Sequence, residues 1–345
     1  MPPSSLTLEE LGWRPFFQGQ LAPESLDCPV VRVTAQHRDR LALLGAAGAT
    51  HLDLCPAMPP ITVGDWLVLS PAGRFECLLE RQSVFRRKAA GRKVGEQLIA
   101  ANVDTVFVVT SLDEDFKLNR IERYLSMIHE AGATPVVVLS KADLCPDTTP
   151  FQRRVQDLDP LLVVEAVNGL DARDVERLAP WCGAGQTVAL MGSSGVGKST
   201  LVNGLLGRET QRTAAVREAD SKGRHVTTAR SLHRITAGGW LLDTPGMREL
   251  QLADCEEGLA VTFTDIASLA EHCRFGDCRH DGEPGCAVQD AIDRGELDAR
   301  RLASYRKLER EQALNAATLA EKHARDRRFG RMVKAHLAEK RRRER

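Results

Sequence analysis

The sequence has no excess of either charge, no long apolar run and no leader-like beginning, and each lack removes a class of protein. Its 345 residues carry 47 Lys and Arg against 47 Asp and Glu, so total charge indicates no partner. No uninterrupted apolar stretch reaches the roughly 18 residues that a membrane span needs. The beginning, MPPSSLTLEELGW, lacks the basic and then apolar regions of a signal peptide. We therefore expect a soluble, cytoplasmic protein with no membrane partner.

The sequence also lacks the cysteine pattern of a disulfide framework. Nine cysteines is an odd number, and thiols stay reduced in the cytoplasm. Cysteines that cluster are therefore better interpreted as metal ligands. A content of 43% hydrophobic and 27% charged residues is typical of a folded chain, and the length favours two or three domains.

Three regions of different character follow one another, and we expect each to be a domain. Residues 28–90 hold short β-rich runs broken by Gly and Pro, which indicates a small barrel or sandwich. Residues 95–253 alternate apolar strands with helices, which predicts an α/β domain whose parallel sheet is covered on both faces. Residues 254–345 hold a Cys/His cluster, then helices, with eleven Lys and Arg against four Asp and Glu from Glu321 to the end.

The strongest motif is a phosphate-binding loop of the pattern GxxxxGK[ST], with TVALM as a strand before it and LVNGLL as a helix after it. Its glycines let backbone amides approach a polyphosphate. Lys198 neutralises the terminal phosphates, and the Ser199 hydroxyl ligates Mg²⁺. The alternative is an ordinary Gly-rich turn. The expected nucleotide-binding residues of the loop are Gly192, Ser193, Ser194, Gly195, Val196, Gly197, Lys198, Ser199 and Thr200.

Two later stretches are expected to complete the phosphate and magnesium site. The sequence DTPG ends an apolar strand, so Asp243 is expected to hold the magnesium shell and Gly246 to offer its amide to the terminal phosphate. Between the loop and this stretch lies GRHVTT, residues 223–228, in which a threonine could close over the magnesium. The alternative for GRHVTT is an ordinary polar loop.

A base-reading element is expected before the phosphate loop, where Ser140, Lys141 and Asp143 end the apolar strand TPVVVL. They resemble the [NT]KxD box of GTPases, whose Asp accepts two hydrogen bonds from the guanine edge, and adenine offers no such donor pair. The end of a parallel strand is where such folds bind ligands. Ala166, at the end of the next strand, could bring its amide to the guanine oxygen.

Both base-reading elements precede the phosphate loop, whereas they follow it in ordinary GTPases. With this order, GRHxTT and the metal cluster described below, the chain resembles the circularly permuted ribosome-assembly GTPases of the RsgA (YjeQ) family from about Val30 to about Glu311. The resemblance implies an N-terminal OB barrel, a permuted GTPase domain and a C-terminal zinc-binding domain. It also implies the small ribosomal subunit and its rRNA as partners.

The chain departs from the family at three positions: Ser140 replaces the usual Asn, Val226 a Thr, and Glu165 a Ser. Serine is shorter, so we expect position 140 to lose the amide that braces the phosphate loop and the base pocket. Because Val226 has no hydroxyl, the magnesium ligand is expected to be Thr227 or Thr228. We assign this role to Thr228.

The residue after DTPG is Met247, where many GTPases carry a Gln that orients the attacking water. Methionine cannot orient water. The family resemblance points instead to His225, so the expected catalytic residues are His225, Lys198, Thr228 and Thr227. The alternative is that His225 is an exposed loop histidine.

The metal cluster is CxxxxCxHxxxxxC, with Cys273, Cys278, His280 and Cys286 within fourteen residues. Three thiolates and one imidazole suit a closed, tetrahedral, structural zinc site. The segment is too short and polar to pack a core of its own, so it needs a bound metal ion to fold. The family has its zinc ligands at the same places, and the alternative is unligated cysteines. The other cysteines are expected to be packing residues: Cys28, Cys55, Cys77, Cys145, Cys182 and Cys255.

These motifs predict an Mg²⁺-dependent enzyme that binds GTP and GDP, hydrolyses GTP, and holds one zinc ion per chain. The barrel, the zinc module and the basic tail favour an RNA partner, although by themselves they leave open either a nucleic acid or an acidic protein surface. From the family resemblance we expect it to act late in small-subunit maturation. Because Met247 removes the usual water-orienting side chain, we expect the subunit to stimulate hydrolysis, and we also expect a monomer. Two alternatives stay open: a P-loop ATPase or kinase with a structural zinc module, and an RNA-binding protein that does not hydrolyse its nucleotide.

Overall fold

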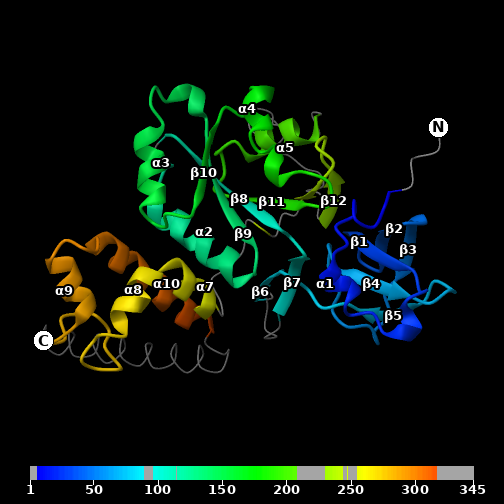
Figure 1. Cartoon of the computed structure of the whole chain (residues 1–345), viewed down its shortest axis with the longest axis horizontal. Helices are drawn as coiled ribbons and strands as arrows, with labels where there is room; N and C mark the ends of the chain where they lie inside the picture. The colour runs from blue at the N-terminus through cyan, green and yellow to red at the C-terminus, as the bar shows by residue number, and fades with distance from the viewer. Residues whose placement is uncertain are drawn as a thin grey trace, which may run out of the picture.

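Three bodies lie along the molecule in Figure 1: a β-rich one from the first strands, a central α/β one, and a helical one near the C-terminus. The computed structural model describes residues 6–88, 96–113, 115–207, 230–243, 247 and 255–316. The expected multidomain fold class is confirmed by this arrangement. The domain boundaries themselves stay predictions.

The N-terminal body is a barrel-like set of antiparallel strands. Strand β1 pairs with both β2 and β4, β2 pairs with β3, and β4 pairs with β5. Alternate side chains point inward and form an apolar cluster that includes Val33, Leu41 and Leu67. The strands are β1 (Val30–Gln36), β2 (Arg40–Gly45), β3 (Gly48–Asp53), β4 (Trp66–Leu69) and β5 (Phe75–Leu78).

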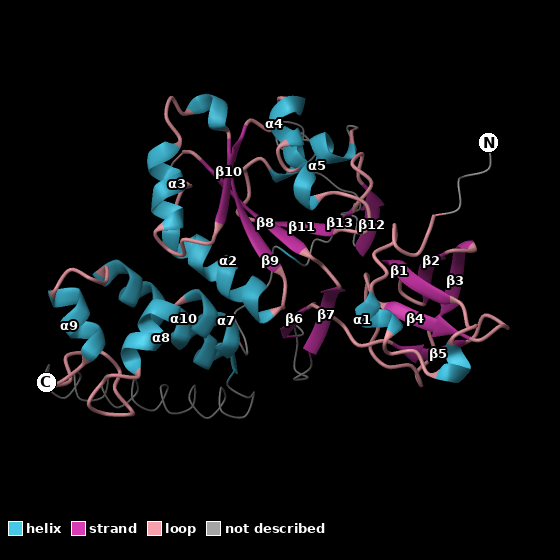
Figure 2. Ribbon diagram, viewed as in Figure 1, coloured by secondary structure: helices cyan, strands magenta, loops and turns pink. Residues whose placement is uncertain are grey.

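The central body is a sheet in the order β10-β9-β8-β11-β13-β12, in which each neighbouring pair is parallel except β13 with β12. Figure 2 shows helices on both of its sides. The strands are β8 (Thr105–Ser111), β9 (Thr134–Ser140), β10 (Val163–Val167), β11 (Thr187–Met191), β12 (Arg230–Arg234) and β13 (Trp240–Asp243). The helices are α2 (Leu118–Glu130), α3 (Thr149–Gln156), α4 (Ala172–Glu176) and α5 (Lys198–Leu206), and 3-10 turns span Ala142–Leu144 and Ala179–Trp181.

Strand β8 is apolar at successive positions because both of its faces are buried. Val106 and Val108 join the apolar cluster that contains residues of α2, while Phe107 and Val109 join the cluster that contains residues of α5. Successive side chains of a strand point to opposite faces, so a strand covered on both sides must be apolar throughout.

The barrel-like body and the central sheet are joined through Arg32 of β1. Its buried guanidinium donates to the carbonyl oxygens of Leu11 and Asn102 and to the hydroxyl of Thr187, at the start of β11. Burial lowers the pKa of Arg32 to about 10. Strand β1 also pairs with β12, Ala35 lying opposite Ser231, so one sheet runs through both bodies.

Two parts of the chain fall across or outside the expected boundaries. Strands β6 (Val84–Lys88) and β7 (Glu96–Ala101) pair with each other in a separate sheet, and the expected boundary lies between them. Ahead of residue 28, helix α1 (Pro15–Gln18) is followed by the 3-10 turn Pro23–Ser25. The ring of Trp13 lies 4.9 Å from that of Trp66, so this leading segment packs on the barrel-like body.

The cysteines outside the metal cluster divide into two groups. Cys182 and Cys255 are buried, and Cys28 and Cys145 pack against the core, as expected of packing residues. The expectation is wrong for Cys55 and Cys77, which are exposed: Cys55 follows the end of β3, and Cys77 lies on β5, where side chains are half-buried or exposed. Among the described residues, no helix is both long and apolar enough to cross a membrane.

The C-terminal body docks on α2 through buried charges. The Glu122 carboxylate has 0% exposure and accepts hydrogen bonds from Arg300 and Arg301. Arg301 also donates to the carboxylate of Asp265 and to two backbone carbonyls. The helices are α7 (Glu256–Thr262), α8 (Thr264–Ala270), α9 (Ala287–Asp293) and α10 (Ala299–Ala316).

We expect Arg301→Met to destabilise the protein by about 3 kcal/mol, because Glu122 and Asp265 lose a shared buried partner. Arg300 still contacts Glu122, so the cost should lie at the lower end for a broken buried pair. Urea unfolding followed by circular dichroism measures the change. Arg310→Met is the matched control on the same helix, since Arg310 is exposed and donates only to a backbone carbonyl among the described residues. Equal stabilities of the two variants would contradict the prediction.

Candidate nucleotide site and metal centre

The sheet topology brings the base-reading and phosphate-binding stretches to one edge. Strands β8, β9, β10 and β11 are parallel, so their carboxyl ends meet at the same edge (Figure 2). Ser140 at the end of β9 lies opposite Ser111 of β8 and Val167 of β10. The carboxyl edge of an open parallel sheet is where such folds bind ligands.

The phosphate loop leaves β11 under steric constraint. Gly192 has φ 151°, and a Cβ there would lie 2.2 Å from the carbonyl oxygen of Val109 on β8. Gly197 has φ 90° and precedes Lys198, the first residue of α5. Only glycine meets both demands without strain. The loop therefore holds its backbone close to β8 and opens directly into the positive end of a helix.

Lys198 folds back along its own loop. It is 6% exposed, and its Nζ donates to the carbonyl oxygens of Gly192, at 2.7 Å, and of Ser193. The ammonium is thereby held inside the curve of the loop. Terminal phosphates of a nucleotide are the partners that this lysine meets in phosphate loops of this pattern.

Ser140 joins strand β9 to the phosphate loop. Its buried hydroxyl lies 2.6 Å from the carbonyl oxygen of Val196 in the phosphate loop and 3.2 Å from that of Thr110. The amide is absent, as expected, but the hydroxyl contacts the loop in its place, because the close approach of β9 to the loop lets a short side chain span the distance. Strand β9, which ends in the expected base-reading residues, and the phosphate loop are therefore hydrogen-bonded to each other.

The base-reading stretch contains a strained lysine. Lys141 has φ 57°, and its Nζ lies 2.9 Å from the Asp113 carboxylate, just after β8. The backbone N–H of Asp115 and the Lys141 ammonium lower the pKa of Asp113 to about 2, so Asp113 stays charged at neutral pH. Asp143 is exposed in the 3-10 turn and bonds to no described residue, which leaves both of its oxygens available to a ligand.

The second base-contacting position is buried at the end of β10. Ala166 is 7% exposed, and its carbonyl oxygen accepts a hydrogen bond from Arg177. Arg177 also pairs with Glu165 at 2.7 Å, so Glu165 is held toward α4 and the turn that follows it. The strand register places Ala166 opposite Leu139, one residue before Ser140.

Part of the expected site falls outside the described residues: His225, Thr227, Thr228 and Gly246. Asp243 ends β13, parallel to β11, and so lies at the same edge as the phosphate loop. Met247 is 3% exposed and belongs to the large apolar cluster. Its side chain packs in the core, as its chemistry favours.

Sequence reasoning missed the loop between β8 and α2. Asp113 pairs with Lys141, Asp115 pairs with Arg120, and Arg120 reaches the phosphate loop through Ser193. The available signal was a pair of carboxylates directly after a buried strand, the position at which parallel folds place functional side chains.

The Cys/His cluster is assembled as a metal centre. The ligand atoms of Cys273, Cys278, His280 and Cys286 all lie within 4.8 Å of one another. Two sulfur atoms are 4.0 Å apart, and the His280 Nδ1 lies 3.6 Å from Cys273 and 3.4 Å from Cys286. A tetrahedral zinc ion demands about 3.8 Å between sulfurs and about 3.6 Å between nitrogen and sulfur. This group could therefore hold zinc.

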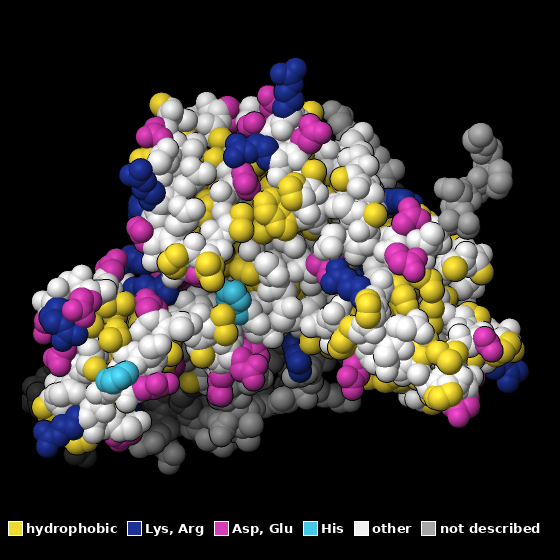
Figure 3. All heavy atoms as spheres, viewed as in Figure 1, with side chains coloured by type: hydrophobic (Ala, Val, Ile, Leu, Met, Phe, Trp, Pro, Cys, Tyr) yellow, Lys and Arg dark blue, Asp and Glu magenta, His cyan; other side chains and the backbone are white. Residues whose placement is uncertain are grey.

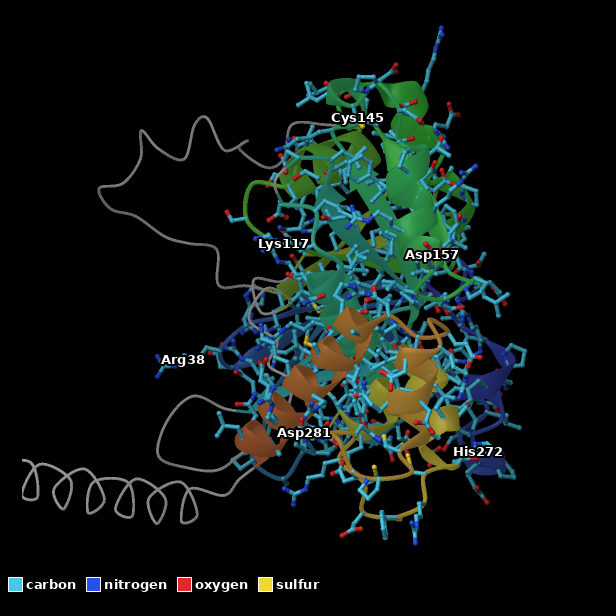
Figure 4. All side chains as sticks on the ribbon, turned by 90° about the vertical axis from the view of Figure 1, so that its left-hand side faces the viewer. Arg38, Lys117, Cys145, Asp157, His272 and Asp281 are labelled. Atoms are coloured by element: carbon cyan, nitrogen blue, oxygen red, sulfur yellow. The ribbon has the colours of Figure 1, made fainter. Side chains whose placement is uncertain are left out.

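The metal centre lies in loops on the helical C-terminal body. In Figure 4, sulfur atoms gather at the end of the molecule where His272 and Asp281 are labelled. His280 has φ 58°, which turns the chain sharply, and Cys286 caps α9 by accepting from the N–H of Gln289. The centre therefore fixes the start of α9.

Comparisons with known proteins agree on one family. The RsgA GTPase family model matches residues 78–253. A Vibrio parahaemolyticus protein named small ribosomal subunit biogenesis GTPase RsgA 2 is 57% identical over 342 residues, covering 99% of this chain and 96% of its own length. The small ribosomal subunit biogenesis GTPase RsgA of Mesorhizobium japonicum is 48% identical over 318 residues, covering 90% of this chain and 92% of its own.

Two solved structures share the fold. YjeQ from Thermotoga maritima matches with a TM-score of 0.61 at 23% identity, over 81% of this chain and 96% of its own. YloQ, described as a circularly permuted GTPase, matches with a TM-score of 0.61 at 22% identity, over 86% of this chain and 99% of its own. The expected permuted architecture is confirmed.

We expect one zinc ion per chain when the protein is purified under reducing conditions, and Cys286→Ser should lose most of it, because one thiolate of a closed set is removed. Inductively coupled plasma mass spectrometry measures the content. Cys255→Ser is the matched control, a buried cysteine outside the group, and should keep its zinc. Zinc-free wild-type protein, or equal zinc in both variants, would refute the assignment.

Proposed function

Because the chain belongs to the RsgA family and is a GTPase, we propose that it acts late in the maturation of the small ribosomal subunit. The observation that carries the proposal is the similarity to RsgA proteins over nearly the whole chain. The joined site, in which the proposed base-reading strand is hydrogen-bonded to the phosphate loop, supports its GTPase part. The names of the similar proteins support the subunit as its target. We infer that it works in the cytoplasm, as a monomer.

The proposed chemistry is phosphoryl transfer to water by positioning and charge. Lys198 and the amides of residues 192–200 bind the phosphates. Mg²⁺, which the donor set fits, would be held by Ser199 and Thr228, with Asp243 in its shell. His225 would place the attacking water, since Met247 packs in the core.

The proposed RNA contacts lie outside the nucleotide site. On the face seen in Figure 3, charged side chains of both signs are scattered rather than gathered in one basic patch. Residues 28–90 as an OB-like unit and the basic end of residues 254–345 are the proposed rRNA contacts, flanking the GTPase unit of residues 95–253. The zinc ion would have a structural role, since four protein ligands leave no coordination position for a substrate.

Asp143→Asn should reduce the preference for GTP over ATP about 100-fold, because an amide donor then replaces one of the charged acceptor oxygens that face the two guanine donors. Xanthosine triphosphate should bind the variant better than it binds the wild type, because its added carbonyl meets the new amide. Calorimetric titration of the three nucleotides measures this.

Asp147→Asn is the matched control, since Asp147 is exposed nearby and its capping of Thr149 survives in Asn. Wild-type protein that binds ATP as well as GTP would favour the ATPase or kinase alternative.

Hydrolysis should be slow in the isolated protein and rise when small subunits are added, because Met247 supplies no water-orienting group. His225→Ala should lower the stimulated rate about 100-fold, the typical range for a lost positioning group, with GTP affinity almost unchanged. Phosphate release measured with and without purified subunits provides the check. Binding of GTP without turnover in either condition would favour the non-hydrolysing RNA-binding alternative.

A further inference from the structure

Arg120 reaches the phosphate loop from a neighbouring helix. It lies in the first turn of α2, and its Nη1 donates to the Ser193 hydroxyl at 2.6 Å. The same nitrogen pairs with the Asp115 carboxylate. Ser193 directly follows Gly192 in the loop, so a cation from outside the phosphate motif is fixed against the part that surrounds a polyphosphate.

Two cations converge on this one loop residue. Lys198 donates its ammonium to the Ser193 carbonyl, while Arg120 donates its guanidinium to the Ser193 side chain. The Asp115 carboxylate offsets the charge of Arg120 at the place where it contacts the loop. Lys198 is the residue that meets the β- and γ-phosphates in this motif, and Arg120 is bonded to the same loop residue as that lysine.

Arg120 has donors left for a ligand. Its three hydrogen bonds to described residues all leave from Nη1, so Nε and Nη2 have no partner among them. The side chain is 32% exposed, so a ligand in the loop can approach it. A guanidinium presents five donors in a fork that matches phosphate oxygens, and it keeps its charge at every physiological pH.

The helix that carries Arg120 is anchored from its other side. Glu122, two residues further along α2, holds Arg300 and Arg301. Asp115 fixes the guanidinium itself. A group held in place before the reaction needs little reorganisation when charge develops.

We propose that Arg120 is a catalytic residue of GTP hydrolysis, an arginine supplied by the chain itself that donates hydrogen bonds to the terminal phosphate. Water attacks the γ-phosphorus, the bond to the β–γ bridging oxygen breaks, and GDP leaves with that electron pair. The proton of the water passes to the released phosphate or to solvent. Arg120 stays protonated and stabilises charge on the phosphate oxygens, the role of arginine fingers.

The test compares Arg120→Gln with Arg123→Gln, which removes a neighbouring arginine of α2 that bonds to Glu311 rather than to the loop. Single-turnover GTP hydrolysis is measured with and without small subunits. Arg120→Gln should be slower by about 1,000-fold or more in both conditions, in line with arginine fingers, and Arg123→Gln should stay within about threefold of wild type. GDP affinity should change little in either.

A second readout separates catalysis from a merely structural role. GDP with aluminium fluoride mimics the transition state, and Arg120→Gln should lose this binding while it keeps GDP binding; Arg120→Lys should restore part of both rate and binding. Equal loss of GDP and of the mimic would make Arg120 a structural brace and overturn the inference.

The inference rests on the proposed GTPase site. A wild type without GTP turnover would overturn both, whereas an active wild type with an unaffected Arg120→Gln would overturn only the role of Arg120.

Discussion

The parallel pairing of β8 with both β9 and β11 is the constraint on which the nucleotide site depends. Strand β9 ends in the proposed base-reading residues and β11 leads into the phosphate loop, and β8 lies between them. The loop can pass so close to β8 only because Gly192 has no side chain to meet the Val109 carbonyl. That closeness puts the loop within reach of Ser140. A permuted chain order changes none of this, because the site depends on which strands are neighbours rather than on which comes first.

Helix α2 connects this site to the C-terminal body. Its first turn contacts the phosphate loop through Arg120, and Glu122 on the same helix is buried against two arginines of α10. A buried carboxylate with two cationic partners tolerates little displacement, because each lost hydrogen bond leaves a charge unpaired. A displacement of α10 would therefore either be opposed by α2 or displace α2, which contacts the phosphate loop through Arg120.

Motifs with short spacing were predictable from the sequence, whereas contacts between distant segments were not. The phosphate loop and the Cys/His group each lie within fourteen residues or fewer, so local spacing indicates their chemistry. The bond from Ser140 to Val196 depends on strand register and on how close the loop lies to β9, so the sequence predicted the lost amide but not the hydroxyl contact that takes its place. Arg120 looks like an ordinary surface arginine until the packing of α2 places it against Ser193. The exposure of Cys55 and Cys77 likewise depends on which strand face is covered.

The burial of Met247 links the phosphate side of the sheet to the metal-binding module. One continuous apolar cluster contains Met247, residues of α2, Phe263 and Cys286, which is a ligand of the candidate metal centre. A side chain in such a core cannot also face the attacking water, so packing and water placement must fall to different residues. Close-packed interiors transmit displacement rather than absorb it. The position that many GTPases use to orient water is here part of the core that joins the nucleotide-binding body to the metal-binding one.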